Sequence, residues 1–343
     1  MRATTPAIAG LGSLRFRREA NATMSQAVRR EEQTPSLTER VDRIHLRQRL
    51  GIEREGEAPV FGRGRTVFHP ENVLSFYSIL RGLLRVSGLY GRGQRNARRI
   101  RLVHNDLTVP GLPAGLEGLR LLQIADPHLD SHPEYPAALA ECVHELDYDI
   151  CVLTGDYRFR TTGAMEPALD GLSRLRACLG DPVYAILGNH DSIHMVPPLE
   201  EMGIQLLLNE AVGIERNGDT LYIAGVDDPH FFRADNLEKA CRDIPENAPS
   251  ILLAHSPEIF RQAASCGFGA MLCGHTHGGQ IRLPGGVAVF TNVDCPRRFA
   301  AGNWRFRQLH GYTSLGAGSS IVDVRFNCPP EVVIHTLRDR GVQ

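Results

Sequence analysis

Two histidines one residue apart, in the segment MLCGHTHGGQ at residues 271–280, are side chains that could bind a metal ion in this 343-residue chain. An isolated pair of this kind at the end of a strand is more often a solvated turn than a metal site. Polar side chains also follow four other short apolar runs, however, as DPH, GD, GNHD and AH. Aspartate, asparagine and histidine all bind divalent cations, so the five segments together indicate one metal centre, with glycines that let the backbone come close.

The apolar runs before these segments have the length and composition of buried strands. They are rich in Val, Ile and Leu and alternate with helical patterns over residues 137–146 and 164–179, which is typical of an α/β sheet covered by helices. Open α/β sheets bind ligands at the carboxyl ends of their strands, where the polar segments lie. We predict strands over residues 119–125, 149–154, 182–187, 220–226, 250–255 and 268–274.

In order and spacing, the series DPH, GDY, GNHD, AHSP and GHTHGGQ resembles the calcineurin-like metallophosphoesterases over roughly residues 119–337. The resemblance implies an α/β fold, a four-layer α/β/β/α sandwich with the metal site at the carboxyl ends of the strands. The ending GHTHGGQIRLP, followed by VRFNCPPEVVIHTL, is similar to a bacterial branch of this family. Members of that branch often carry a membrane-spanning or membrane-associating segment and act on phosphodiesters, some of them lipid-linked.

The resemblance implies a binuclear metal centre built from seven side chains. The ions would be Mn, Fe or Zn, because imidazole and carboxylate ligands suit these metals and no thiolate is in the set. Two such ions about 4 Å apart lower the pKa of a shared water toward neutrality and give hydroxide for in-line attack on phosphorus. Asp126, His128 and His277 would hold the first ion, Asn189, His255 and His275 the second, and Asp156 would bridge the two.

Four further residues have expected roles beside the metals. By resemblance, His190 would protonate the leaving oxygen or stabilise the transition state, with Asp191 orienting its ring. After GD, many relatives continue with small or acidic residues, whereas this chain reads YRFRTTG. Arg158 and Arg160 in that loop could clamp a phosphate, although loop arginines are more often solvated.

The segment GVDDPHFF at residues 225–232 is interpreted as cap or turn chemistry, with a substrate-loop role as the alternative.

Positive charge is concentrated at the front of the chain. Residues 1–101 hold 20 Arg against 9 acidic residues, a net charge of +11, and the remainder has a net charge of −12. A basic front favours phosphate-bearing partners, either lipid head groups or nucleic acid, although the preference for Arg over Lys is also typical of coding bias.

We predict three regions: a disordered basic leader over residues 1–35, an Arg-rich helical extension over 36–101 and the phosphoesterase domain over 102–343. In the extension, SLTERVDRIHLRQRLG predicts a short helix that ends at Gly51. Apolar residues then follow helical spacing from residue 71, and arginines continue to residue 101. The segment 71–101 fits a helix on an anionic membrane surface or, equally, one that packs on its own domain.

The eight cysteines form no C-x-x-C pair, and several lie inside apolar runs, as expected for free thiols in a reducing compartment. No stretch reaches the roughly 18 apolar residues of a spanning helix, and the N-terminus is a poor signal peptide, with Met24 as an alternative start. We therefore expect a cytoplasmic protein, peripheral at the inner membrane face if the helical segment binds lipid.

The leading hypothesis is a metallophosphoesterase that cleaves a phosphodiester or pyrophosphate bond in a lipid-linked or nucleotide substrate. A nuclease would use the same metal centre with the basic extension on nucleic acid, but that extension has few aromatic residues for base stacking. A non-catalytic scaffold on the same fold would be expected to have lost metal ligands, and none is missing.

Overall fold

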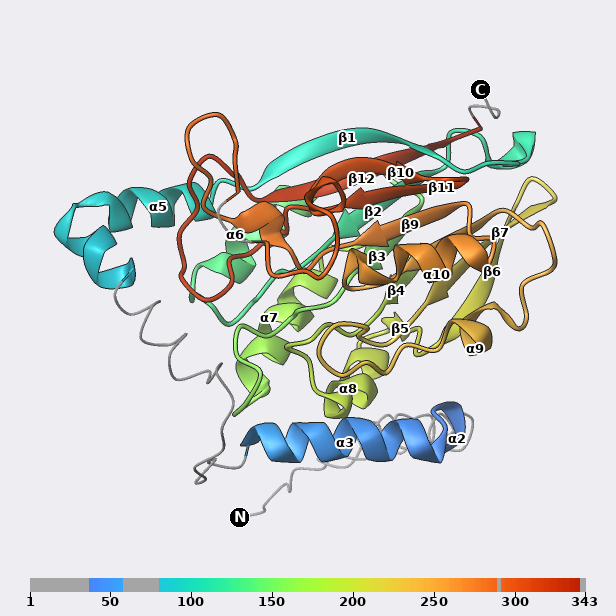
Figure 1. The fold of residues 1–343 in the computed structure, drawn as a ribbon, viewed down its shortest axis with the longest axis horizontal. Helices are drawn as coiled ribbons and strands as arrows, with labels where there is room; N and C mark the ends of the chain where they lie inside the picture. The colour runs from blue at the N-terminus through green and yellow to red at the C-terminus, as the bar shows by residue number, and fades with distance from the viewer. Residues whose placement is uncertain (1–36, 58–79, 289–290, 340–343) are drawn as a thin grey trace, which may run out of the picture. The chain divides into compact units, whose positions relative to one another are not determined.

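Two six-stranded mixed sheets form the centre of this computed structural model, which describes residues 37–57, 80–288 and 291–339 (Figure 1). The chain divides into two compact units, one ending at Leu46 and the other beginning at Arg47. The first unit contains α2 (Leu37–Arg40) and the start of α3 (Arg43–Glu57). Both sheets belong to the second unit.

The first sheet has the strand order β1-β12-β2-β3-β4-β5, and β2 to β5 run parallel to one another. The last strand, β12, lies between β1 and β2, parallel to β1 and antiparallel to β2. The strands are β1 (Arg101–Thr108), β2 (Arg120–Ile124), β3 (Ile150–Leu153), β4 (Val183–Ala185), β5 (Gln205–Leu206) and β12 (Glu331–Arg338).

The second sheet has the order β10-β11-β9-β8-β7-β6, with four parallel strands at its centre and an antiparallel strand at each edge. Asn217 and Gly218, both at positive φ, make the hairpin between β6 and β7, as an Asn-Gly pair favours. The strands are β6 (Glu210–Arg216), β7 (Asp219–Gly225), β8 (Ser250–Leu253), β9 (Ala270–Cys273), β10 (Gly302–Phe306) and β11 (Leu309–Thr313).

A buried apolar core fills the space between the two sheets. Leu121 of β2 and Ile251 of β8 belong to this core, whereas Leu252 packs in a second core with residues of the helices on the outside of its sheet. The central strands are thus buried on both faces, which explains why they appear in the sequence as continuous apolar runs. All six predicted strands are present, with ends that lie within two residues of the predicted ones.

Helices flank the two sheets and complete the expected four-layer α/β/β/α sandwich (Figure 1). The connections between parallel strands place α6 and α7 along the first sheet, and residues of α9 and α10 pack in the outer core of the second sheet. The helices are α6 (Tyr135–Val143), α7 (Glu166–Arg176), α8 (Val196–Glu201), α9 (Leu237–Cys241) and α10 (Phe260–Ser265).

The helices before β1 differ from the sequence-based expectation in two ways. Helix α3 continues through Gly51 to Glu57, so the predicted end at Gly51 is wrong. Glycine ends a helix when it adopts a left-handed conformation, and Gly51 is instead helical, at a cost of about 1 kcal/mol relative to alanine. The second predicted helix begins within residues 71–79, which lie outside the described part of the chain.

The described part of that segment forms a helical arm, residues 80–97, which consists of helical residues 80–86 and α5 (Leu89–Ala97). Gly88, at φ 71°, separates the two pieces, so they are not one continuous helix. Helix α5 packs on its own domain, because Gly93 approaches Val324 and Phe326 so closely that a Cβ there would lie within 3 Å of both side chains. Among the described residues, no helix is both long enough and apolar enough to cross a bilayer.

Candidate metal centre

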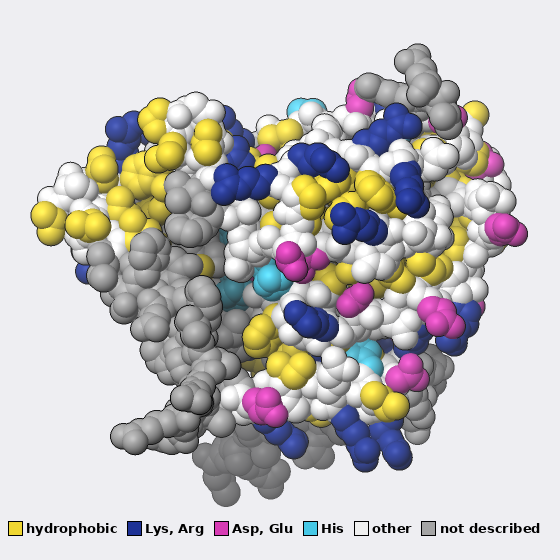
Figure 2. Space-filling view, viewed as in Figure 1, with side chains coloured by type: hydrophobic (Ala, Val, Ile, Leu, Met, Phe, Trp, Pro, Cys, Tyr) yellow, Lys and Arg dark blue, Asp and Glu magenta, His cyan; other side chains and the backbone are white. Residues whose placement is uncertain are grey.

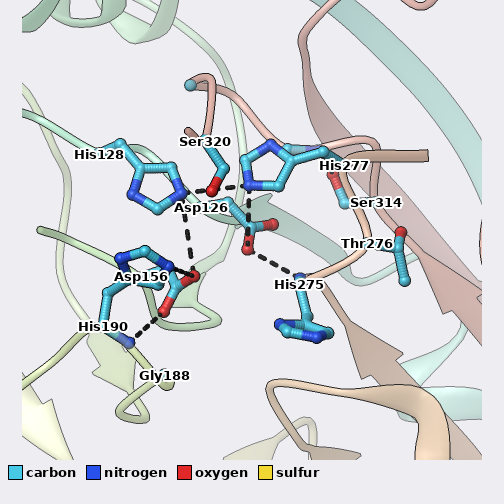
Figure 3. Close-up of polar contacts among 12 residues, drawn as sticks. Asp126, His128, Asp156, Gly188, His190, His275, Thr276, His277, Ser314 and Ser320 are labelled. Carbon is cyan, nitrogen blue, oxygen red and sulfur yellow. Dashed lines mark hydrogen bonds and ion pairs between the residues drawn. The ribbon is translucent and has the colours of Figure 1, made fainter. Parts of the chain in front are cut away.

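The seven side chains predicted to bind metal meet at one rim of the structure. They follow the carboxyl ends of three parallel strands of the first sheet, β2 to β4, and of two parallel strands of the second, β8 and β9. Histidine side chains are visible in a hollow of the molecular surface in Figure 2, and Figure 3 draws polar contacts at this rim.

Six of the seven residues form two groups of three, and within each group the ligand atoms lie within 4.8 Å of one another. Asn189 joins the second group, since its Oδ1 is 3.0 Å from Nε2 of His255 and 2.8 Å from Nδ1 of His275. All six side chains are buried. The first group is Asp126, His128 and His277, and the second is Asp156, His255 and His275.

Asp156 lies between the two groups. Its Oδ2 is 3.3 Å from Nε2 of His255, in the second group, and 3.8 Å from Nε2 of His128, in the first. A carboxylate has two oxygens and can serve two cations, so this position suits a ligand shared between two ions.

The donor set fits a pair of divalent ions. It combines imidazole nitrogens, carboxylates and one amide oxygen, the ligands that suit Mn, Fe and Zn. Oδ2 of Asp126 is buried and has no hydrogen-bond partner, a costly arrangement for a carboxylate unless a cation binds there.

The pKa shifts of the buried groups in the pocket also favour a bound cation. Burial lowers the pKa of His128 to about 3, so its ring is neutral and free to donate a lone pair. Burial opposes a charge on His255, but the Asp156 carboxylate raises its pKa to about 10. Burial also raises the pKa of Asp126 to about 7. A proton on His255 or a bound cation would therefore supply the positive charge that these carboxylates require.

The backbone is bent to aim these side chains inward. A left-handed conformation costs a non-glycine residue about 1 to 2 kcal/mol and persists only where the surroundings enforce it. Gly274 is required for a different reason, because a Cβ there would lie 2.5 Å from Oδ2 of Asp126. This is the close approach expected of the glycines. The ligand residues at positive φ are Asp126, His128, Asp156, His275 and His277.

His190 lies beside the metal-binding groups with its Nε2 3.9 Å from Oδ2 of Asp156. Its Nδ1 contacts the carbonyl of Phe159 at 2.9 Å, so the main chain orients the ring. The expectation that Asp191 orients this ring is wrong. The Asp191 carboxylate instead accepts hydrogen bonds from the amides of Gly188 (2.9 Å), Asp156 (2.7 Å) and Tyr157 (2.8 Å).

Asp191 therefore ties the loop after β4 to the loop after β3, because its carboxylate reaches amides in both. Burial, and then the nearby Asp156 charge, raise the pKa of Asp191 to about 6. Helix α3 supports the same loop from outside: Glu53 accepts hydrogen bonds from the hydroxyl of Ser192 (2.6 Å) and the amide of Ile193 (2.8 Å).

Arg158 and Arg160 differ in environment. Arg158 is buried, its Nη2 donates to the carbonyl of Gly163 at 2.8 Å, and its Nε has no partner. Arg160 is exposed and lines a cleft beside the metal centre. The two side chains therefore do not form a simple pair, and Arg160 is the more accessible to a ligand.

Arg325 contacts the metal centre, and sequence analysis did not assign it a role. It is fully buried, and its Nη2 donates to Nδ1 of His277 (3.0 Å) and to the carbonyl of Gly316 (3.1 Å). Its Nε donates to the carbonyl of Gly318 at 3.0 Å. The only signal in the sequence is its place in VRFNCPP, which carries part of the family resemblance but gives no hint of a contact with His277.

Gln280, the last residue of GHTHGGQ, holds another residue that was not predicted. Its side-chain amide donates to the carbonyls of Ser320 (2.9 Å) and Val322 (2.7 Å), and its Oε1 accepts from the Ser320 amide (2.8 Å). In Figure 3 the Ser320 hydroxyl points toward the space between His128 and His277. Gln280 thus fixes a hydroxyl at the edge of the first metal-binding group.

The segment GVDDPHFF forms a turn held by Asp228, as expected. The Asp228 carboxylate accepts from the amides of His230 (3.2 Å), Phe231 (2.7 Å) and Phe232 (2.8 Å). This turn also places the His230 ring 4.2 Å from the ring of His275, so it borders the second metal-binding group.

Comparisons with known proteins agree with this geometry. Residues 119–279 match the family model of the calcineurin-like phosphoesterases. The chain is 30% identical to metallophosphoesterase YkoQ of Bacillus subtilis over 259 residues, which cover 72% of this chain and 93% of YkoQ. It is 33% identical to phosphodiesterase YaeI of Escherichia coli over 197 residues, 54% of this chain and 69% of YaeI. A zebrafish transmembrane protein with a metallophosphoesterase domain is 30% identical over 221 residues, 59% of this chain and 49% of that protein.

Proposed function

Because the chain belongs to the calcineurin-like metallophosphoesterase family, and is thus a hydrolase of phosphoester bonds, we propose that it cleaves a phosphodiester or pyrophosphate bond with two divalent ions. The observation that carries this proposal is the position of Asp156, within 4 Å of imidazole nitrogens from both metal-binding groups. YaeI, a relative named as a phosphodiesterase, supports the choice of a diester.

In this proposal Asp156 would be shared by the two ions, and the other six ligands would divide between them as the two groups suggest. When bound, the ions would supply a hydroxide nucleophile near neutral pH and offset the charge of the phosphate oxygens. The first ion would be held by Asp126, His128 and His277, and the second by Asn189, His255 and His275.

His190 acts on the leaving group in this proposal. A bond forms between the attacking oxygen and phosphorus, the bond from phosphorus to the leaving oxygen breaks, and that oxygen takes up a proton. Because the Phe159 carbonyl accepts from Nδ1, His190 in its doubly protonated form has the Nε2 proton available to donate to this oxygen or to stabilise the transition state. Asp191 is then a positioning residue that holds the loops around Asp156 and His190.

We further propose that the substrate is lipid-linked or a nucleotide, and that the protein works at the inner face of a membrane. The helical arm supports this location, because the side chains of Leu83 and Val86 at its tip are 63% and 90% exposed. Exposed arginines accompany them, as in helices that bind anionic lipid surfaces. Hydrophobic side chains gather over the α5 region in Figure 2.

Replacing Asp156 tests the catalytic proposal. Asp156→Asn keeps the shape of the side chain but removes its charge, so we expect hydrolysis of bis(p-nitrophenyl) phosphate in Mn-containing buffer to fall by at least 100-fold. Metal content, measured by mass spectrometry of the purified protein, should fall as well. Asp243→Asn, on an exposed residue after α9, is the matched control and should retain both. Unchanged turnover in Asp156→Asn would remove the bridging role.

A further inference from the structure

A cleft of about 550 Å³ lies beside the metal centre, and the hydrolysis described above does not use it. Clefts of this size accommodate a whole small molecule rather than a single ion. Its walls come from the helical arm, from the loop after β2 and from the loop between β3 and α7. The lining residues with the clearest chemistry are Arg81, Tyr90, Asp130, Phe159, Arg160 and Asp323.

Phe159 connects this cleft to the metal centre. Its carbonyl contacts Nδ1 of His190 at 2.9 Å, and its ring meets the ring of His128 edge-on with centroids 6.0 Å apart. A molecule in the cleft would therefore contact Phe159, the residue whose carbonyl orients the His190 ring. We propose above that His190 acts on the leaving oxygen. The cleft is positioned for the part of a substrate that extends beyond the scissile phosphorus.

Two arginines in the cleft have unused hydrogen-bonding capacity. The guanidinium of Arg160 has no hydrogen bond or ion pair among the residues that the structure describes. Arg81 donates from Nη2 to the carbonyl of Ile321 at a long 3.4 Å, and its Nε is buried without a partner. Buried guanidinium nitrogens without partners are costly, and an anionic ligand would satisfy them.

The acidic residues of the cleft are already engaged. Oδ1 of Asp130 accepts the amide of Phe159 at 2.6 Å. Oδ2 of Asp323 accepts from the Gln94 side chain at 3.2 Å and pairs with Arg98 at 3.7 Å.

A third arginine adds positive charge from behind the wall. Arg158 is buried, and its Nη2 donates to the carbonyl of Gly163, a residue that lines the cleft. Arg81 and Arg160 line the cleft, and Arg158 lies behind its wall. Of the two aspartates that line it, Asp323 pairs with Arg98, whereas Asp130 has no arginine partner in the described part of the chain. The cleft therefore favours an anion.

We propose that this cleft binds the leaving-group side of the substrate, and that this side carries a second phosphate, which Arg81 and Arg160 hold. A guanidinium matches a phosphate through two parallel hydrogen bonds, and Tyr90 and Phe159 line the cleft beside the two arginines. The inference rests on the proposed hydrolysis and adds that the substrate has two phosphate groups. The second phosphate belongs either to a nucleotide or to a glycerol phosphate head group, which present the same anion to the arginines.

Calorimetric titration of the full-length chain tests this assignment. The protein is first freed of metal with a chelator, because bound divalent ions would themselves attract phosphate, and its fold is checked by circular dichroism. Adenosine 5′-monophosphate and sn-glycerol 3-phosphate are the phosphate probes, and adenosine is the uncharged control. We expect at least one phosphate probe to bind at least tenfold more tightly than adenosine.

Arginine variants locate the binding. Arg160→Gln and Arg81→Gln should each weaken phosphate binding at least fivefold, and Arg160→Lys, which keeps the charge but loses the planar fork, should lie between. Arg261→Gln, on an exposed arginine of α10, is the matched control and should bind as the unaltered chain does. Tighter binding of the adenosine phosphate would identify a nucleotide, and tighter binding of glycerol phosphate a lipid head group.

Full affinity in both glutamine variants, or binding of both phosphate probes no tighter than that of adenosine, would overturn the assignment. A separate measurement tests the proposed hydrolysis. If the unaltered chain binds the phosphate probe through Arg160 but does not hydrolyse bis(p-nitrophenyl) phosphate, the reaction is refuted and the cleft remains a phosphate site. If it hydrolyses the diester and binds neither probe, the cleft assignment is refuted alone.

Discussion

Nη2 of Arg49 donates to the main-chain carbonyl of Asp191 at 2.7 Å, so helix α3 supports the loop that carries His190. The guanidinium is completely buried, lies 3.3 Å from the Asp227 carboxylate and stacks 3.4 Å above the ring of Phe232. A residue 142 positions away in the sequence thus fixes the main chain next to the proposed acid.

Replacing Arg49 should therefore reduce the stability of the protein. Arg49→Met keeps much of the volume but leaves the buried Asp227 carboxylate without this partner, so we expect the free energy of unfolding to fall by about 3 kcal/mol. Urea denaturation measures the change. Arg47→Met, on an exposed residue of the same helix, should change it by less than about 0.5 kcal/mol. Equal effects of the two substitutions would contradict the supporting role.

Removing the Gln280 side-chain amide should loosen the loop that carries Ser320. Gln280→Ala loses three hydrogen bonds to that loop, each worth about 1 kcal/mol. We expect kcat for a phosphodiester to fall roughly tenfold while bound metal is retained, since Gln280 is not a predicted ligand. Gln205→Ala, at an exposed position of β5, serves as the control. Loss of metal with unchanged kcat per metal would argue against a role through Ser320.

The exposed tip of the helical arm should bind anionic membranes. Val86→Glu and Leu83→Glu place a negative charge on the apolar tip, so each should reduce cosedimentation with phosphatidylglycerol vesicles several-fold. Leu102→Glu alters an exposed apolar residue of β1, outside the arm, and should bind as the unaltered chain does. The proposal is wrong if all three variants sediment equally, or if neutral phosphatidylcholine vesicles bind as well as anionic ones.

His335 should make the protein sensitive to acid. Burial lowers its pKa to about 3, its Nδ1 accepts from Asn105 at 3.0 Å, and its Nε2 contacts Oε1 of Gln123 at 2.9 Å, so the folded state holds a neutral ring. The unfolded state takes up this proton near pH 6.5, so stability is lost as the pH falls from about 6.5 toward 3, by up to about 1.4 kcal/mol per pH unit. In urea titrations, His335→Gln should reduce the dependence of the free energy of unfolding on pH. The variant should also be less stable than the unaltered chain at pH 8. His144→Gln, on an exposed histidine, should leave the slope unchanged, and the same slope in both variants would exclude His335 as its source.

The six predicted strands were predictable because each has a local signal. A strand buried on both faces gives a continuous apolar run, and the polar residues that follow it lie at its carboxyl end by covalent connection alone. The clustering of Asp126, His128 and His277 follows from the order of such strands in the sheets, which the family resemblance supplied.

Other parts of the site had no local signal. The true partners of Asp191 are main-chain amides in its own loop and in the loop after β3, and nothing in the sequence marks an amide as available. The end of α3 was misplaced for a similar reason: Gly51 weakens a helix in isolation, but the contacts of Arg49 and Glu53 with the body stabilise the helix on both sides of it.

By itself, the sequence determined which residues can bind metal and which strand end carries each of them, since side-chain type and neighbouring hydrophobicity are local properties. Only the tertiary structure decided what holds those residues in place. The contacts of Arg325 with His277, and of Arg49 with Asp191, join segments 48 and 142 positions apart. Such contacts depend on how the chain packs in three dimensions, which no periodicity or spacing along it encodes.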